Sequence, residues 1–223
     1  MSELSQTVSL GSVSTTLSLA VRLVDCYTGS LPLGDPEVRI ENRDVEPVRN
    51  PSGYHVFLDL DPGTVTVVVD GGRYYVDERV TDVDAVDLTD PATNVDPSDP
   101  ATLPLERIEL APAPPYLFPS TATIVRGTVH DPAGKVLPDA TVSITDVNRD
   151  TRTDANGEFV LFLDSVRDEN ATVDDGAVRV NGTAPVLTVS HPDLGSTSDT
   201  LADSGGHSVL REGELTVRDI QYP

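Results

Sequence analysis

The chain has 223 residues, a formal net charge of -22, an apolar fraction of 38% and only 4% aromatic residues. This length allows one large domain or two small ones, and the scarcity of aromatics favours two compact cores of Val, Leu and Ile. No stretch reaches 18 consecutive apolar residues, so we expect no membrane insertion. No basic patch is present to neutralise phosphates, which argues against nucleic acid as a partner.

The acidity comes from a particular choice of residues. There are 26 Asp against 11 Glu, and 14 Arg against a single lysine, Lys135. Short, strongly hydrated carboxylates with almost no lysine are typical of proteins from salt-loving organisms. At molar ionic strength the Debye length is about 3 Å, so such a surface tolerates its own repulsion. We therefore expect a protein of a haloarchaeon that works in a high-salt solvent. An acidic disordered chain is the alternative, and the strand patterns below argue against it.

Short segments that alternate apolar and polar residues follow one another along the chain, bounded by Gly, Pro, Asn or Asp. No segment carries a sustained apolar stripe with the period of a helix. The expected strands, in chain order, are 17–25, 36–40, 54–60, 64–70, 105–110 (as an edge strand), 124–129, 140–144, 158–164, 176–180, 186–190 and 214–220. Strands of this length and spacing predict an all-β protein built from Ig-like or transthyretin-like β-sandwiches.

Proline marks the expected boundary between two such sandwiches. Eight of the 18 prolines fall between Pro91 and Pro119. Because proline cannot donate to a β-ladder, it belongs on edges and in linkers. We predict an N-terminal β-sandwich over residues 1–110, a Pro-rich linker over 111–120 and a second β-sandwich over 121–223.

The two halves resemble each other, which predicts a tandem repeat of one sandwich. In each half two apolar strand positions precede a turn glycine, Gly53 or Gly157, at the same spacing and with a common offset of 104 residues. These positions are Val38 and Ile40 in the first half, and Val142 and Ile144 in the second.

The segment TDANGEF (153–159) contains the residue types of a calcium loop, but not their spacing. Asp154 and Asn156 could fill the first two ligand positions, yet Gly157 follows at the fourth position, whereas an EF-hand needs glycine at the sixth. An Asn-Gly pair between two strands instead predicts a tight hairpin turn with positive φ angles.

The second half also resembles a known family, the carboxypeptidase regulatory-like domain, which is a transthyretin-like or Cna-B-like β-sandwich. Its pattern is a V-x-G-x-V strand, a D-x-x-G turn, a P-x-A-x-V strand and a T-D-x-x-G-x-F hairpin. The matching residues are Val125, Gly127, Val129, Asp131, Gly134, Pro138, Ala140, Val142, Thr153, Asp154, Gly157 and Phe159. The first half departs from this pattern, with His55 at the position of the aromatic Phe159.

The overall arrangement has a second resemblance. A first half with RNPSGYHVFLDL (49–60) and the junction APAPPYLFPSTATIVRGTV (111–129) are similar to proteins that accompany phage-tail-like contractile injection particles. The N-terminus has no basic region or twin arginine and carries Glu3, so we expect no secretory signal. Both features imply synthesis in the cytoplasm and release, if any, as part of a particle.

No catalytic, cofactor-binding or metal-binding constellation is recognisable, and we expect no enzyme activity and no cofactor. The four histidines are scattered without ligand spacing, at His55, His130, His191 and His207. A Lys–Asn isopeptide bond, which some Cna-B-like domains contain, needs a lysine inside a strand, whereas Lys135 lies in a turn.

Two further features have alternative interpretations. The sequons Asn170–Thr172 and Asn181–Thr183 would be glycosylated on an exported protein, and without an export signal we interpret them as coincidence. The candidate interface residues are Tyr116, Leu117 and Phe118, with Tyr74 and Tyr75. The alternative for both aromatic groups is a structural role, in which they fold back to cover the junction or a hairpin.

Three functions fit this fold class, because sandwiches serve many purposes. The first is a structural component of a phage-tail-like contractile particle, with other protein subunits as partners. The second is a cell-surface adhesion or carbohydrate-binding module, and the third is an accessory domain of an enzyme. The expected absence of an export signal favours the first.

Overall fold

The computed structural model describes residues 17–83, 104–163 and 170–222, and its regular elements are all β-strands. Within these ranges no helix is long and apolar enough to cross a membrane. The chain divides into two compact units. The first unit comprises Met1–Leu23, Val38–Val68 and Glu78–Ile108, and the second comprises Val24–Glu37, Val69–Asp77 and Glu109–Pro223. The predicted domain boundaries at residues 110 and 120 stay a prediction.

The first half of the chain forms two sheets. Their strand orders are β3-β4-β1-β7 and β2-β5-β6. The strands are β1 (Leu17–Asp25), β2 (Glu37–Ile40), β3 (Val48–Arg49), β4 (Tyr54–Leu58), β5 (Gly63–Asp70), β6 (Asp77–Val83) and β7 (Leu105–Leu110). The inward-facing side chains of these strands form the apolar core of the first unit. The buried core residues include Leu19, Val21, Val38, Ile40, Phe57, Val67 and Ile108.

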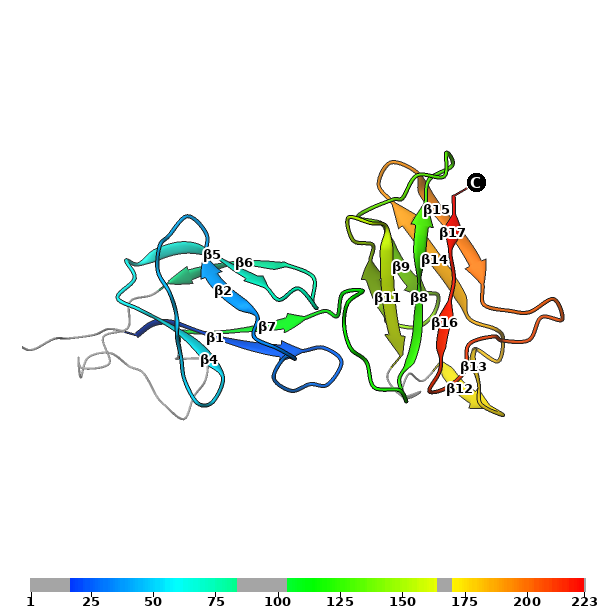
Figure 1. Cartoon of the computed structure of the whole chain (residues 1–223), viewed down its shortest axis with the longest axis horizontal. Coiled ribbons are helices and arrows are strands. Elements are labelled where there is room, and N and C mark those ends of the chain that lie inside the picture. The colour runs from blue at the N-terminus through cyan, green and yellow to red at the C-terminus, as the bar shows by residue number, and fades with distance from the viewer. Residues whose placement is uncertain (1–16, 84–103, 164–169, 223) are drawn as a thin grey trace, which may run out of the picture. The chain divides into compact units, whose positions relative to one another are not determined.

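The second half forms two larger sheets and a hairpin, with β8 lying between β11 and β16 (Figure 1). One sheet has the order β11-β8-β16, with β17 also paired to β8, and the other has the order β10-β9-β14-β15. The strands are β8 (Thr123–His130), β9 (Thr141–Ile144), β10 (Asp150–Arg152), β11 (Glu158–Leu163), β12 (Ala171–Asp174), β13 (Ala177–Val180), β14 (Val186–His191), β15 (Gly195–Thr200), β16 (Leu215–Val217) and β17 (Ile220–Gln221). The pair β12–β13 is the hairpin.

The two halves share most of their strand order, and they differ at the third strand, because β3 pairs with β4 whereas β10 pairs with β9. The order β4-β1-β7 corresponds to β11-β8-β16, and β2-β5-β6 corresponds to β9-β14-β15. The predicted fold class, all-β with sandwich-like sheets in tandem, is confirmed. The expected strand 214–220 is instead two strands, β16 and β17, which pair with β8 in one parallel register and are interrupted at residues 218–219. The carbonyl of Arg218 comes so close to Gly127 that a Cβ there would lie 1.5 Å from it.

The surroundings of β11 explain why its sequence, EFVLFL, is apolar at successive positions. Phe159, Leu161 and Leu163 point into the core between the two sheets. Side chains of a strand alternate between faces, so Val160 and Phe162 point the other way. Val160 is nevertheless buried, at 1% exposure, in a second cluster with Ala122 and Ile124. Something therefore covers the outer face of this sheet as well.

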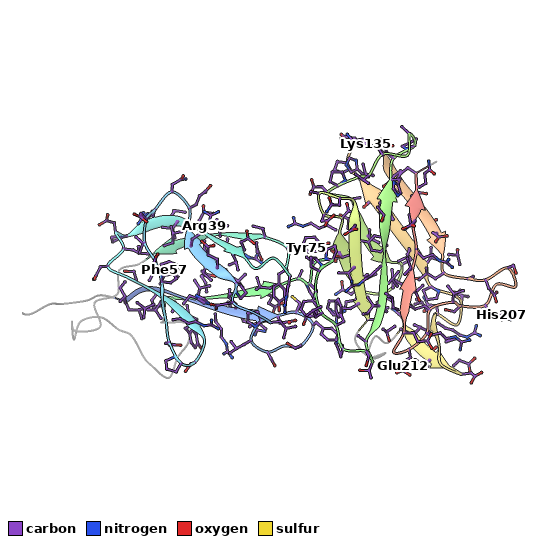
Figure 2. All side chains as sticks on the ribbon, in the orientation of Figure 1. Arg39, Phe57, Tyr75, Lys135, His207 and Glu212 are labelled. Atoms are coloured by element: carbon purple, nitrogen blue, oxygen red, sulfur yellow. The ribbon has the colours of Figure 1, made fainter. Side chains whose placement is uncertain are left out.

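One type of tight loop recurs four times, with the sequence Asp/Asn-x-x-Gly-x. The N–H of the first residue donates to the carbonyl of the fifth at 2.8–3.0 Å, and the glycine N–H donates back to the carbonyl of the first. The first side chain accepts the N–H of the fifth residue at 2.9–3.0 Å. The glycines have φ between 72° and 83°. The loops are 50–54, 131–135, 154–158 and 203–207; Figure 2 shows Lys135 and His207, which close two of them, away from the sheets.

This geometry corrects one detail of the predicted turn at TDANGEF. Gly157 alone takes the positive φ, and Asn156 does not. The turn also joins β10 and β11, which belong to different sheets, so it is a corner between sheets instead of a hairpin. The Asp154 carboxylate accepts N–H bonds from Asn156 and Glu158, so it shapes the loop.

Candidate functional site

The most concentrated polar feature of the second unit is a buried aspartate at the end of β1. The Asp25 side chain is fully buried, at 0% exposure. Its Oδ1 accepts the backbone N–H groups of Tyr27 at 2.7 Å and Thr28 at 3.1 Å. Its Oδ2 accepts the hydroxyl groups of Tyr74 at 2.8 Å and Tyr116 at 2.5 Å. We call these five residues the Asp25 network.

Four donors around one carboxylate explain how a charge can be buried here. An isolated carboxylate away from water is very unfavourable, whereas one that accepts several hydrogen bonds is stabilised. The same environment favours the neutral form of the two tyrosines. Burial, together with the adjacent Asp25 carboxylate, raises the pKa of Tyr74 to about 12, although the N–H of Leu33 donates to the same hydroxyl. Burial and Asp25 also raise the pKa of Tyr116. Both hydroxyls therefore stay protonated and donate at neutral pH.

Aromatic rings surround the network and cover the outer face of the β11–β8 sheet. The Tyr27 ring packs edge-on against Phe118 at 5.0 Å and against Phe162 at 5.2 Å, between ring centroids. Tyr116 lies 4.5 Å from Phe118 and 5.5 Å from Tyr74. Tyr27 and Phe118 also pack on the buried cluster that includes Val160. We call these five rings the aromatic cap, and two of them, Tyr27 and Phe118, supply the missing cover for the second face of β11.

An arginine of β8 fixes the segment that carries the cap. The guanidinium of Arg126 donates to the carbonyl of Tyr116 at 2.8 Å and lies 5.7 Å from the centre of the Phe118 ring. The segment predicted as a linker is thus held at Tyr116 by its own side chain and by its backbone.

The structure separates the five predicted interface residues into three environments. Tyr74 and Tyr116 are buried, at 3% and 1% exposure, and Phe118 is half-buried in the same cap. Leu117 is 63% exposed. Tyr75 lies apart from the cap, beside Arg152. A role for these residues in binding a partner stays a prediction.

The sequence interpretation missed Asp25, Tyr27, Phe162 and Arg126 as members of this site. The sequence did contain a signal for Asp25, because this acid ends a strand and directly follows the apolar Leu23 and Val24, which are buried. Nothing in the local sequence pairs it with a tyrosine 91 positions away.

Tyr75 and Arg152 border a separate cleft of about 350 Å³ in the second unit. The Tyr75 hydroxyl donates to the Arg152 carbonyl, and the Arg152 guanidinium lies over the Tyr75 ring at 5.0 Å. The guanidinium also donates to the Val76 carbonyl at 3.0 Å. Tyr75 is labelled in Figure 2.

Other residues that could take part in chemistry have roles in the fold or lie outside the Asp25 network. Burial raises the pKa of the Cys26 thiol, and the carboxylates of Glu109 and Asp25 raise it further, so the thiolate is disfavoured. Both sequon asparagines donate their side-chain amides to Asp146, Asn170 to its carbonyl and Asn181 to its carboxylate, each at 3.0 Å. In the described ranges, no group of three or more His, Cys, Asp or Glu side chains is placed to hold a metal ion.

The strand orders and the buried cluster define a β-sandwich module with an aromatic cap. Residues 124–174 match the family of the carboxypeptidase regulatory-like domain, which confirms the resemblance on the residues of β8 to β12. No curated protein sequence matches the chain.

Two solved structures are similar to the chain at a low level. The Bacillus anthracis TIE protein has 14% identity and a TM-score of 0.31, over 93% of this chain and 34% of that one. A C-terminal fragment of the pilus adhesin SpaC from Lactobacillus rhamnosus GG has 10% identity and a TM-score of 0.23, over 91% and 96%. The chain thus spans about a third of the length of the first.

Proposed function

We propose that the protein is a non-enzymatic structural module of a large assembly, specifically a subunit of a phage-tail-like contractile particle of a haloarchaeon. The Asp25 network carries this proposal. A buried carboxylate with four donors could be catalytic, yet here all four donors belong to its own fold and its two tyrosines keep their protons. The charge is used to hold three chain segments together.

The recurrent Asp/Asn-x-x-Gly-x loops support the same conclusion. In each loop the side-chain oxygen accepts backbone N–H groups of the loop itself. These residues resemble ligands in sequence, but their local role is to fix a turn. A module that uses its polar side chains in this way is suited to mechanical support more than to turnover.

The experiment is sedimentation of a native lysate through a gradient that contains molar KCl throughout. We expect the protein to sediment with a large particle and to be found there with other subunits. The purified chain, run alone in the same gradient, is the control and should stay near the top. Recovery of the cellular protein only at the position of the free chain would contradict the proposal, and recovery with cell envelopes would favour the adhesion function instead.

A further inference from the structure

Strand β16 ends its sheet with two exposed apolar side chains. Leu215 and Val217 are 55% and 61% exposed. In the parallel register Leu215 lies opposite Ile124 of β8, and Val217 lies opposite Arg126. Ile124 packs in the cluster on the outer face of this sheet, beneath the aromatic cap. Paired residues of neighbouring strands share a face, so Leu215 and Val217 lie on this outer face too, where the cap leaves them exposed.

The backbone of the same two residues points out of the sheet, along what we call the β16 edge. The Ile124 N–H donates to the Glu214 carbonyl. Further along, the Arg218 N–H donates to the Arg126 carbonyl. Backbone groups alternate in direction along a strand, so those of the two apolar residues face away from β8. Strand β16 is the last of its sheet, on the side of β8 opposite to β11 (Figure 1), and this edge is therefore open to a further strand.

The corresponding strand of the first half differs at its exposed positions. Strand β7 holds the place in the order β4-β1-β7 that β16 holds in β11-β8-β16. The exposed side chains of β7 include Arg107 and Glu109, and charges of this kind discourage pairing with another strand. Leu215, Thr216 and Val217 contain neither a charge nor a proline, in a chain with 37 acidic residues. The β16 edge is therefore suited to recognition by strand addition.

The sequence of the chain contains a segment that matches this edge. Residues 4–21 form its longest run without Asp, Glu, Lys or Arg, and residues 17–21 of this run belong to β1. Before β1, residues 7–10 have the sequence TVSL, which alternates hydroxyl and apolar side chains as the LTV of β16 does. Each copy of the chain carries a net charge of -22, so two copies repel least where a neutral segment meets a neutral edge.

We propose that residues 7–10 of one copy of the chain, the TVSL segment, add as a strand to the β16 edge of a second copy. Val8 and Leu10 then pack against the two exposed apolar side chains of β16, while the backbone groups of both strands pair. The TVSL segment and the β16 edge are different parts of the chain, so the contact is head-to-tail and repeats into a linear series. The inference rests on the proposed function and deepens it, because it names a second copy as one partner in the assembly.

The contact is small, so one pair of copies should associate weakly. A strand of three residues with two exposed apolar side chains buries far less than a standard interface of about 1,600 Å². We expect a dissociation constant on the order of 0.1–1 mM, so the dilute chain in a gradient stays single. Salt does not screen apolar or backbone contacts, so the association should persist between about 1 M and about 3 M KCl.

The test is sedimentation velocity of the purified full chain in molar KCl, from about 0.01 mM to about 1 mM protein. We expect the unchanged chain to form a series that grows with concentration. Val217→Asp should weaken the association at least about tenfold, and so should the double variant Val8→Asp/Leu10→Asp. Val48→Asp is the matched control and should associate normally, because Val48 is 58% exposed in β3, which ends a sheet of the first half.

A mixture of the two defective variants tests the head-to-tail arrangement. Val217→Asp keeps the TVSL segment, and the double variant keeps the β16 edge. Mixing them should therefore restore association, but only as far as a pair of chains. The dispersion of the amide spectrum, recorded for each variant labelled with ¹⁵N, checks that the variants are folded.

Several results would overturn the inference. A mixture that stays single, equal association in all variants, or no association at millimolar protein would each do so. Loss of association in Val217→Asp but not in the double variant would assign the edge to pairing of β16 with itself. Amide signals of residues 214–218 that the double variant shifts in the dilute, single chain would place the TVSL segment on its own copy.

The two proposals can fail separately. Association of the purified chain as described, without a particle in the lysate, would contradict only the proposed function. A particle in the lysate, with a purified chain that stays single at millimolar concentration, would contradict only the strand addition.

Discussion

The Tyr116 hydroxyl donates to the Asp25 carboxylate at 2.5 Å, and the two residues are 91 positions apart in the sequence. Tyr74 donates to the same oxygen from a third segment, 49 positions after Asp25. A charged acceptor strengthens each bond, and burial keeps water from competing. One carboxylate thereby joins the end of β1, the segment before β6 and the segment before β8.

Replacement of Asp25 should destabilise the second unit strongly. Asp25→Asn removes the charge and turns one acceptor oxygen into a donor that faces existing donors. We expect the free energy of unfolding to fall by about 2 kcal/mol or more. Chemical denaturation in molar KCl measures it, with Glu212→Gln as a control that makes the same charge change on an exposed residue. Equal stability of the two variants would show that the network contributes little.

The raised tyrosine pKa values predict loss of stability in alkali. Unfolded tyrosine has a pKa near 10, whereas the pKa of Tyr74 in the fold is about 12 and that of Tyr116 is also raised. Between these values the unfolded chain has lost protons that the folded chain retains, so stability must fall as pH rises. The contribution is fully present below pH about 10 and declines above it.

Unfolding midpoints measured across the alkaline range test this prediction. Tyr116→Phe removes one titrating group, so its curve should decline less steeply, although it starts lower. Tyr54→Phe is the matched control, because Tyr54 lies in β4 and belongs to neither the Asp25 network nor the aromatic cap. If the unchanged protein and both variants lost stability in parallel as the pH rises, the assignment of the alkaline loss to Tyr116 would be contradicted.

Two glycines of the recurrent loops should differ in their tolerance of alanine. Gly134 and Gly157 both have left-handed backbone, with φ of 80° and 72°. A Cβ at Gly134 would meet nothing within 4 Å, so Gly134→Ala should cost only the backbone term of about 1–2 kcal/mol. A Cβ at Gly157 would lie 2.9 Å from the Val129 carbonyl oxygen and 3.0 Å from the Leu137 nitrogen. Gly157→Ala should therefore cost at least about 1 kcal/mol more.

Thermal unfolding of the two alanine variants in the same buffer makes this comparison. An equal loss of stability in the two variants would mean that the backbone at Val129 moves away from the added Cβ without a cost in free energy.

The net charge of -22 predicts that folding depends on salt. In dilute buffer the carboxylates repel one another over a Debye length of tens of ångströms, whereas at molar salt that length is about 3 Å. We expect the melting temperature to rise steadily with KCl concentration. Sucrose at the same osmolality is the control, and it should help less because it screens no charge. An ordinary melting curve in dilute buffer would contradict the halophilic interpretation.

The sequence predicted the central strands well and missed the strands at the edges. The missed strands include β3, β6, β10 and β15, and each is the last in its sheet. An edge strand buries few side chains, so selection for alternating apolar residues is weak. Strand β15, with the sequence GSTSDT, contains no apolar residue at all. Periodicity reports burial, and it therefore finds a strand only where burial is deep.

The candidate site was harder to predict for a different reason. Phe162 belongs to a run of apolar residues that indicates a strand, but the run does not reveal what covers its second face. That cover comes from Tyr27 and Phe118, which lie far from Phe162 in sequence. Contacts of this kind depend on the register of several strands at once. Tyr74 and Tyr116 could be singled out, and their shared partner Asp25 could not.

The four Asp/Asn-x-x-Gly-x loops give three of the 26 aspartates a geometric cause. A loop of this form closes only if the side-chain oxygen lies one methylene from the backbone, because a longer chain would pass its own N–H partners. Asp131, Asp154 and Asp203 thus belong to the architecture, although by composition they count as surface charge. A redesign that lowers the charge of this chain for ordinary buffers should remove other acids first and use asparagine, as Asn50 already does, at the loop positions.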